Sequence, residues 1–296
     1  MRAMDYVAQL KGLPVEHDFF IGFDSDGCIF DTMEVKQKEC FCPNFIKHFN
    51  LQAGSKYARE VWEFVNLYSK SRGCNRFLAV KQALAFMKER PEFAARSIHI
   101  PDMPQMHKWI EEESKLGNPA LEAKVAATKD EELTALLAWS HAVNDTISEI
   151  VHGIPPFPGV IEVLEKAHGK ADKIVVSQTP LEALTREWEE NKIDHFLNCI
   201  AGQEHGTKTE HLQYAAHGRY VPEKILMVGD APGDLKAAKA NEALFYPIVP
   251  GKEEESWARF ASEAIDKFFA GEFAGSYQDS LLEEFDKALP ATPPWK

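Results

Sequence analysis

The sequence lacks any long uninterrupted run of apolar residues. Its N-terminal segment, MRAMDYVAQLKGLPVEHD, contains no apolar stretch of the length that a signal peptide needs. No later segment approaches the roughly 20 apolar residues of a membrane span. Internal repeats and low-complexity tracts are absent as well. We therefore expect a cytoplasmic protein with no membrane partner.

Cysteine and positive charge are also scarce. Five cysteines scattered over 296 residues are typical of reduced thiols and not of a disulfide framework. Cys40 and Cys42 form a CxC with His48 nearby, but no second ligand pair accompanies them, so buried thiols are favoured over a zinc site. The 33 Lys and Arg residues face 46 Asp and Glu, which gives a formal net charge of -13 at pH 7. This balance disfavours a nucleic-acid partner, because affinity for a phosphate backbone comes largely from Lys and Arg.

What is present is an apolar pattern that changes twice along the chain. After a polar N-terminal segment, residues 19–23 are strand-like, and residues 32–152 show helical periodicity with almost no strand signal. IPPFPG at 154–159 then interrupts the chain. Beyond it, strand-like and helix-like segments alternate in KIVVS, LEALTREWEE, FLNCIAG, TKTEHLQYAA, KILMVGD, DLKAAKA and ALFYPIV. Such alternation is typical of parallel strands with crossover helices in an open α/β sheet.

We expect three parts from this pattern. A discontinuous α/β core covers residues 1–32 and 153–250, an all-helical domain covers residues 33–152, and a C-terminal helical extension, residues 251–296, packs on the core. In the helical domain, SKYAREVWEFVNLYSK and NRFLAVKQALAFMKER are predicted amphipathic helices. Asn118-Pro119 predicts an N-cap and a first-turn proline of another helix, and Asp130 predicts an N-cap.

Acidic residues follow two of the predicted strands. Asp24 and Asp26 come directly after residues 19–23, and their spacing of two points them the same way in extended backbone. Asp230 follows residues 225–228, with Asp234 near the start of the next helix. Ligands of such sheets bind beyond the carboxyl ends of the strands, so we expect four carboxylates to converge there. Carboxylates this close destabilise one another unless a cation binds, and an all-oxygen cluster suits Mg²⁺.

FFIGFDSDGCIFDT has two other interpretations, an EF-hand loop and a simple turn. An EF-hand loop with Gly27 as its sixth residue fails at both ends, because Gly22 and Met33 stand where acids are needed. A simple turn, whose aspartates only cap backbone donors, explains any single Asp-Gly pair. It does not explain the further signals VVS and MVGDAPGD after two other strands.

Together these segments resemble a known family. Asp24-Ser25-Asp26-Gly27 with Asp31-Thr32, Ser177, Lys208, and Gly229-Asp230 with Asp234 are similar, in order, to the four motifs of the haloacid dehalogenase-like hydrolase superfamily. FPGVIEVLEKA resembles members that carry a helical cap between motifs one and two. The resemblance covers roughly residues 19–250 and implies an α/β, Rossmann-like core with an inserted all-helical cap domain.

The resemblance also implies an activity. The prediction is a Mg²⁺-dependent phosphatase that hydrolyses a small phosphorylated metabolite through an aspartyl-phosphate. A phosphomutase acting on a sugar phosphate would use the same aspartates, and a non-catalytic phosphometabolite sensor is a third interpretation. Dehalogenation is disfavoured, because the dehalogenases of the family lack the second aspartate that is present here as Asp26.

Carried over residue by residue, the resemblance makes Asp24 the nucleophile and Asp26 the general acid and base. Asp24, the Asp26 carbonyl and Asp230 would hold Mg²⁺, with support from Asp234. Ser177 and Lys208 would hold the phosphoryl oxygens. From the residues alone, Ser177 is also a candidate helix cap before Pro180, although the phosphoryl contact is favoured. Lys208 lies in Thr-Lys-Thr where many members have Lys-Pro, and is also a candidate solvated helix lysine.

Substrate choice in this family is usually set by the cap. Within Ser71-Arg72-Gly73-Cys74-Asn75-Arg76, the polar residues Arg72, Asn75 and Arg76 are candidate substrate-binding residues. The alternative is that Asn75 is a helix N-cap and the two arginines are solvated helix ends. The sequence identifies neither the substrate nor the oligomeric state.

Overall fold

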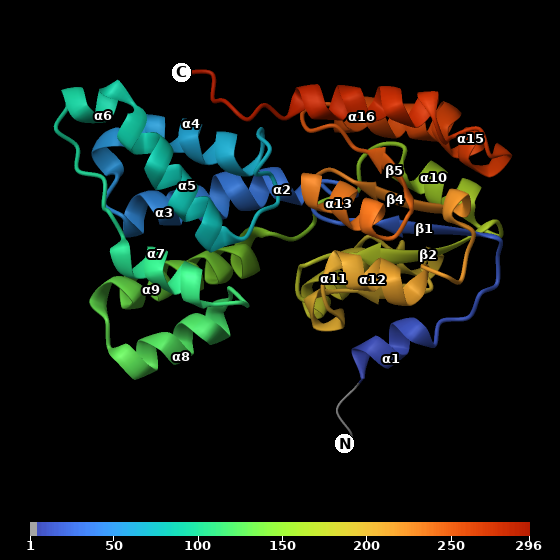
Figure 1. Cartoon of the computed structure of the whole chain (residues 1–296), viewed down its shortest axis with the longest axis horizontal. Coiled ribbons are helices and arrows are strands. Elements are labelled where there is room, and N and C mark those ends of the chain that lie inside the picture. The colour runs from blue at the N-terminus through green and yellow to red at the C-terminus, as the bar shows by residue number, and fades with distance from the viewer. Residues whose placement is uncertain (1–4) are drawn as a thin grey trace. The chain divides into compact units, whose positions relative to one another are not determined.

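A computed structural model describes residues 5–296 (Figure 1). The chain divides into two compact units. The sheet unit consists of the chain up to Thr32 and of Gly153–Leu289, and the helical unit consists of Met33–His152 and Pro290–Lys296. No helix within residues 5–296 combines the length and the apolar character that crossing a membrane requires.

The sheet unit is built on five parallel strands in the order β3-β2-β1-β4-β5. Every residue of β2 and β4 is buried, as expected when helices cover both faces of a parallel sheet. At the centre, Phe23 pairs with Val175 on one side and with Val228 on the other. This confirms the predicted α/β fold. The strands are β1 (Phe19–Phe23), β2 (Ala171–Val176), β3 (Cys199–Ala201), β4 (Ile225–Gly229) and β5 (Leu244–Pro247).

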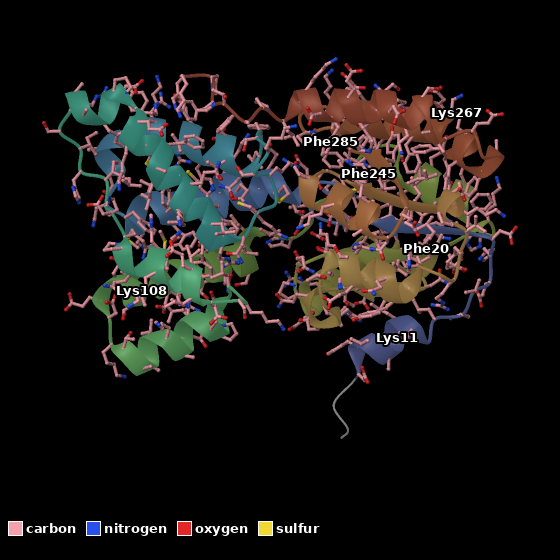
Figure 2. All side chains as sticks on the ribbon, viewed as in Figure 1. Lys11, Phe20, Lys108, Phe245, Lys267 and Phe285 are labelled. Atoms are coloured by element: carbon pink, nitrogen blue, oxygen red, sulfur yellow. The ribbon has the colours of Figure 1, made fainter. Side chains whose placement is uncertain are left out.

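Helices cover both faces of this sheet (Figure 1). Successive strand residues point to opposite faces, so Ile21 packs in one layer and Phe20 in the other. Figure 2 labels Phe20, Phe245 and Phe285 of the second layer, where the ring centroids of Phe245 and Phe285 lie 5.8 Å apart. The first layer is formed by α10 (Val160–Ala167), α11 (Leu181–Glu190), α14 (Glu253–Arg259) and α15 (Ile265–Ala270), and the second by α1 (Tyr6–Lys11), α12 (Lys208–Ala215), α13 (Pro232–Ala240) and α16 (Ser276–Ala288).

Two of these helical segments differ from the sequence-based expectation. The N-terminal segment, interpreted as merely polar, contains α1, which Asp5 caps by accepting from the Ala8 backbone N–H at 3.0 Å and which buries Leu10. The C-terminal extension, predicted only as helical, begins as α14 and passes through a π-helical segment, Phe260–Ala264, into α15.

The helical unit contains helices and no strand among its described residues. Two of the predicted caps are confirmed: Asn75 accepts from the Phe77 N–H at 3.0 Å and Asp130 from the Leu133 N–H at 2.9 Å. Asn118 was predicted as an N-cap but is the first residue of its helix; Gly117 takes the N-cap position, and Pro119 lies in the first turn as predicted. The elements are α2 (Thr32–Val35), which spans the boundary, a π-helical segment (Lys36–Phe41), α3 (Cys42–His48), α4 (Ser55–Asn66), α5 (Arg76–Glu89), α6 (Pro91–Ala95), α7 (Pro104–Glu112), α8 (Asn118–Thr128) and α9 (Glu131–Ile150).

Cys40 and Cys42 are buried in the helical unit. Burial raises the pKa of the Cys40 thiol to about 11 and that of Cys42 to about 12. Within residues 5–296, neither thiol belongs to a group of side chains that could hold a metal ion. Both are therefore interior thiols, as expected.

The last residues of the chain belong to the helical unit. Trp295 packs against Phe64 and Phe86, with ring centroids 5.4 and 6.5 Å away, and the Arg90 guanidinium lies 4.6 Å from the Trp295 ring. The sequence-based boundary placed all of residues 251–296 on the core. The difference arises because Trp295 can cover an aromatic and cationic surface of α4 and α5.

Candidate active site

Asp24 lies at the carboxyl end of the central strand. Its backbone N–H donates to the Val228 carbonyl at 2.9 Å, which continues the β1–β4 pairing, and its side chain is buried. One carboxylate oxygen, Oδ1, accepts from the Ser25 N–H at 2.8 Å. Gly27 has φ +75°, a conformation that favours glycine, and turns the chain back just after the aspartates.

Three of the predicted carboxylates converge beside this loop. Oxygens of Asp24, Asp230 and Asp234 all lie within 4.8 Å of one another, and all three residues are buried. Asp230 follows β4, and Asp234 lies in the first turn of α13, where its Oδ2 accepts from the Ala231 N–H at 3.0 Å. A Cβ at Gly229 would lie only 2.5 Å from Cβ and Cγ of Asp234. A glycine there lets Asp234 approach the end of β4.

Lys208 joins two of these carboxylates. It is the first residue of α12, and its Nζ lies 2.7 Å from Oδ2 of Asp24 and 2.6 Å from Oδ1 of Asp234. Thr207 and Glu210 cap the helix by exchanging hydrogen bonds between side chains and backbone N–H groups. The cap fixes the helix start that carries Lys208. The lysine is therefore not a solvated helix residue, which was the alternative interpretation.

The charges of the cluster are strongly coupled. Burial raises the pKa of Asp24 well above its usual value; Lys208 opposes this rise, and Asp234 and Asp230 add to it. Burial alone would lower the pKa of Lys208, but Asp234 and Asp24 raise it above its usual value. Three carboxylates and one ammonium leave a formal charge of about -2. Buried oxygen ligands with this charge fit a small divalent cation such as Mg²⁺.

The carboxylate of Asp26 is not part of that three-carboxylate group. Its Oδ2 accepts from the Thr179 hydroxyl at 2.7 Å, and its Oδ1 accepts from the Thr32 hydroxyl. We expected Asp26 to point with Asp24 because alternate residues of a strand do so. Asp26 lies beyond β1 in a turn, where that alternation no longer applies.

Thr179 was not among the predicted site residues. It lies in the loop after β2, two residues beyond Ser177, so its place at the carboxyl end of a strand was the available signal. Ser177 is buried, and its Oγ accepts from the Thr179 N–H at 3.2 Å. Ser177 thus shapes the loop that presents Thr179 to Asp26. Its contact with a phosphoryl group stays a prediction.

The other predicted residues, Arg72, Asn75 and Arg76, lie in the helical unit. Arg72 is buried and donates from Nη1 to the Leu67 carbonyl at 2.9 Å. Besides capping α5, Asn75 donates to the Leu116 carbonyl at 3.0 Å. These contacts support the cap interpretation of Asn75.

Arg76 is held by its own unit. Its Nη1 donates to Asn144 Oδ1 at 2.8 Å and to Ser140 Oγ at 3.0 Å, and its guanidinium lies 5.0 Å from the centre of the Phe41 ring. Burial lowers the pKa of Arg76 to about 10. Arg76 is therefore not the solvated helix end of the alternative interpretation. Substrate binding by Arg72, Asn75 and Arg76 stays a prediction.

Comparisons with known proteins agree with this geometry. Residues 102–246 match the family model described as haloacid dehalogenase-like hydrolase. No curated protein matches the chain. Among solved structures, one from Lactobacillus delbrueckii subsp. bulgaricus, named provisionally as a phosphoglycolate phosphatase, is 15% identical with a TM-score of 0.50, covering 88% of this chain and 100% of that one.

Two further structures are similar at lower TM-scores. A predicted phosphatase from Clostridium acetobutylicum has a TM-score of 0.43 at 15% identity and covers 86% of this chain and 97% of its own. A predicted phosphoglycolate phosphatase from Haemophilus somnus has a TM-score of 0.43 at 16% identity, with 79% and 85% covered. At such identities, a likeness in structure is evidence of fold and not of substrate.

Proposed function

We propose that this chain, whose residues 102–246 match the haloacid dehalogenase-like hydrolase model, is a Mg²⁺-dependent phosphatase of that superfamily and acts on a small phosphorylated metabolite. The observation that carries this proposal is the buried Asp24 carboxylate at the end of β1, with Lys208 Nζ 2.7 Å away and two further buried aspartates beside it. A carboxylate nucleophile beside a lysine and a set of carboxylates that can bind a cation is what transfer of a phosphoryl group requires, because both positive charges can neutralise phosphoryl oxygens.

In the proposed reaction, an oxygen of Asp24 attacks phosphorus and the bond from phosphorus to the ester oxygen breaks. Asp26 donates a proton to that leaving oxygen. In the second step Asp26 takes a proton from water, the water oxygen attacks phosphorus, and the bond to Asp24 breaks to release inorganic phosphate. Atoms and protons balance over the two steps, because Asp26 gives one proton and later regains one.

The remaining residues act on position and charge. Asp24, Asp230 and Asp234 would hold Mg²⁺, which supplies positive charge to the phosphoryl oxygens when it is bound. Lys208 would neutralise the same oxygens from the start of α12, with Ser177 as a further donor. The hydroxyls of Thr179 and Thr32 hold the Asp26 carboxylate in place while it exchanges its proton.

The test is phosphate release from p-nitrophenyl phosphate and from a panel of phosphorylated metabolites, with and without Mg²⁺. Phosphoglycolate belongs in the panel because the Lactobacillus structure bears the name of a phosphatase for it. We expect turnover to require Mg²⁺ and to be abolished in Asp24→Asn. Exposed Asp279 provides a matched control, since Asp279→Asn makes the same chemical change away from the site.

Two results would contradict the proposal. One is near-normal turnover in an Asp24→Asn protein that retains the wild-type melting temperature. The other is a wild-type protein that releases no phosphate from any ester of the panel at millimolar Mg²⁺. Return of the phosphoryl group to the substrate, with no inorganic phosphate released, would indicate a phosphomutase instead.

A further inference from the structure

Ser25 lies between the two aspartates of the β1 loop, and its hydroxyl is engaged on two sides. Trp188 Nε1 lies 3.1 Å from Ser25 Oγ, and Ser25 Oγ lies 3.1 Å from Oε2 of Glu187. An indole N–H can only donate, so Ser25 accepts from Trp188 and gives its own proton to Glu187. The hydroxyl therefore has one orientation, fixed by two adjacent residues of α11.

The backbone of Ser25 is also the centre of the turn. Its carbonyl accepts from the N–H groups of Cys28, Ile29 and Phe30, at 3.3, 2.9 and 3.2 Å. The Phe30 ring packs edge-on against Trp188, with centroids 5.7 Å apart. Trp188 thus contacts both ends of the turn, and moving Ser25 would move the backbone on either side of it.

A second indole holds the other side of the loop. Trp257 Nε1 donates to the Cys28 carbonyl at 2.8 Å, and the Trp257 ring stacks on Phe23 with centroids 6.4 Å apart. Both tryptophans are fully buried. Trp257 lies on α14, in the segment that extends the chain beyond β5, so this extension contacts the loop that carries Asp24.

We propose that Trp188, through Ser25 and Glu187, and Trp257, through the Cys28 carbonyl, are positioning residues that hold the Asp24–Asp26 loop in its reactive geometry. This inference rests on the proposed phosphatase function for its effect on rate. None of the four side chains is placed against the phosphoryl group. They act by fixing the positions of the Asp24 and Asp26 carboxylates, because a displacement of a reacting group by about 1 Å can lower the rate roughly 100-fold.

α11 also links two loops of the site. The helix begins at Leu181, just after the loop in which Thr179 bonds Asp26, and its last turns carry Glu187 and Trp188. α11 therefore contacts the β1 loop in two ways. Its own residues Glu187 and Trp188 bond Ser25, and the loop that leads into α11 bonds Asp26 through Thr179. A shift of α11 would disturb both contacts together.

The experiment compares Trp188→Phe and Ser25→Ala with a matched control, Trp139→Phe. Trp139 is a fully buried tryptophan of the helical unit, and its Nε1 has no hydrogen-bond partner among the described residues. All three variants and the double variant of Trp188 and Ser25 are measured for amide hydrogen exchange over residues 24–30 and for steady-state kinetics on p-nitrophenyl phosphate with Mg²⁺.

We expect exchange over residues 24–30 to accelerate at least about tenfold in Trp188→Phe and Ser25→Ala, and not in Trp139→Phe. We expect kcat to fall about 10- to 100-fold with KM changed less than about twofold, because misplacement acts on the transition state. The double variant should lose about as much as the single variant with the larger loss, and less than the two losses combined, because both substitutions break the same Trp188–Ser25 hydrogen bond.

Several outcomes would overturn the inference. Unchanged hydrogen exchange over residues 24–30 in Trp188→Phe and Ser25→Ala would show that the hydrogen bonds of Ser25 with Trp188 and Glu187 do not hold the loop. Faster exchange with unchanged kcat would show that the loop does not need this support. If kcat falls as much in Trp139→Phe as in Trp188→Phe and Ser25→Ala, the losses reflect lower stability of the protein in general and not misplacement of the loop. If the wild-type protein releases no phosphate at all, the proposed function fails. Hydrogen exchange over residues 24–30 would then still show whether the Trp188–Ser25–Glu187 hydrogen bonds hold the loop in place.

Discussion

His211 lies one turn after Lys208 on α12 and has no exposed surface. Burial, together with the neighbouring His205 and Lys208, lowers the pKa of its imidazole to about 4. In the unfolded chain the same ring takes up a proton near pH 6.5. The folded state therefore favours the neutral ring, which makes this single side chain a source of acid sensitivity beside the site.

The sign of the effect follows from the lowered pKa. The stability contributed by neutral His211 is fully present above pH about 6.5 and is lost as the pH falls toward 4, because only the unfolded state then binds the proton. The loss is on the order of 3 kcal/mol. We expect His211→Leu to remove this part of the pH dependence, measured by urea unfolding at pH 7 and pH 4.5.

The matched control is His195→Gln, a substitution of an exposed histidine. It should keep the full pH dependence of the wild type. If His211→Leu loses as much stability between pH 7 and pH 4.5 as the wild type does, His211 is not the group responsible.

Among individual residues of the site, the sequence predicted those that directly follow strands. It did not predict the contacts between residues that lie far apart in the chain. Asp24, Asp230 and Ser177 could be named because apolar runs end just before them. The contact of Thr179 with Asp26 spans 153 positions, and that of Ser25 with Trp188 spans 163. No local pattern relates residues so far apart, so only the folded chain reveals these bonds.

Among the elements, the junction of β4 with α13 leaves little room for an added side-chain atom. A Cβ at Gly229 would lie 2.5 Å from the side chain of Asp234, whereas a Cβ at Gly233 would meet no atom within 4 Å. The two glycines are four positions apart, yet only the first is fixed by packing. Their difference provides a paired test of how closely α13 must approach the strand end.

We expect Gly229→Ala to lower the melting temperature and to reduce phosphate release, since Asp234 or the start of α13 must shift. Overpacking of this kind typically costs about 1–3 kcal/mol. Gly233→Ala should keep or slightly raise the melting temperature, because alanine favours a helix over glycine by up to about 1 kcal/mol. Thermal unfolding of both variants checks this. A similar melting temperature in the two would contradict the close approach.

The elements themselves were largely predictable, with informative exceptions. Alternating apolar runs predicted the sheet, and N-cap residues such as Asn75 and Asp130 marked helix starts correctly. α1 was missed because it is short and buries chiefly Leu10, too little for a periodic signal. The predicted end of the first cap helix at residue 70 was too late, since α4 stops at Asn66.

For the molecule as a whole, the division into units does not follow a single cut of the chain. The helical unit takes Pro290–Lys296 in addition to its long insertion. We expect Trp295→Ala to uncover Phe64 and Phe86 and to destabilise this unit by about 1–3 kcal/mol. Hydrogen exchange of amides in α4 and α5 measures the loss. Exposed Thr292 serves as the control, and equal exchange in Thr292→Ala and Trp295→Ala would contradict a role for the indole.

The position of these residues in the chain also determines the order in which the protein can be completed on the ribosome. β1 emerges early, but its partners β2 and β4 follow only after the whole helical insertion, so the central strand waits with both edges unpaired. The insertion in turn lacks Trp295 until residues 290–296 have been synthesised. Each unit therefore lacks a part of its structure during most of translation. A nascent chain that stops just before residue 290 would have a paired sheet, but its helical unit would lack the cover that Trp295 provides.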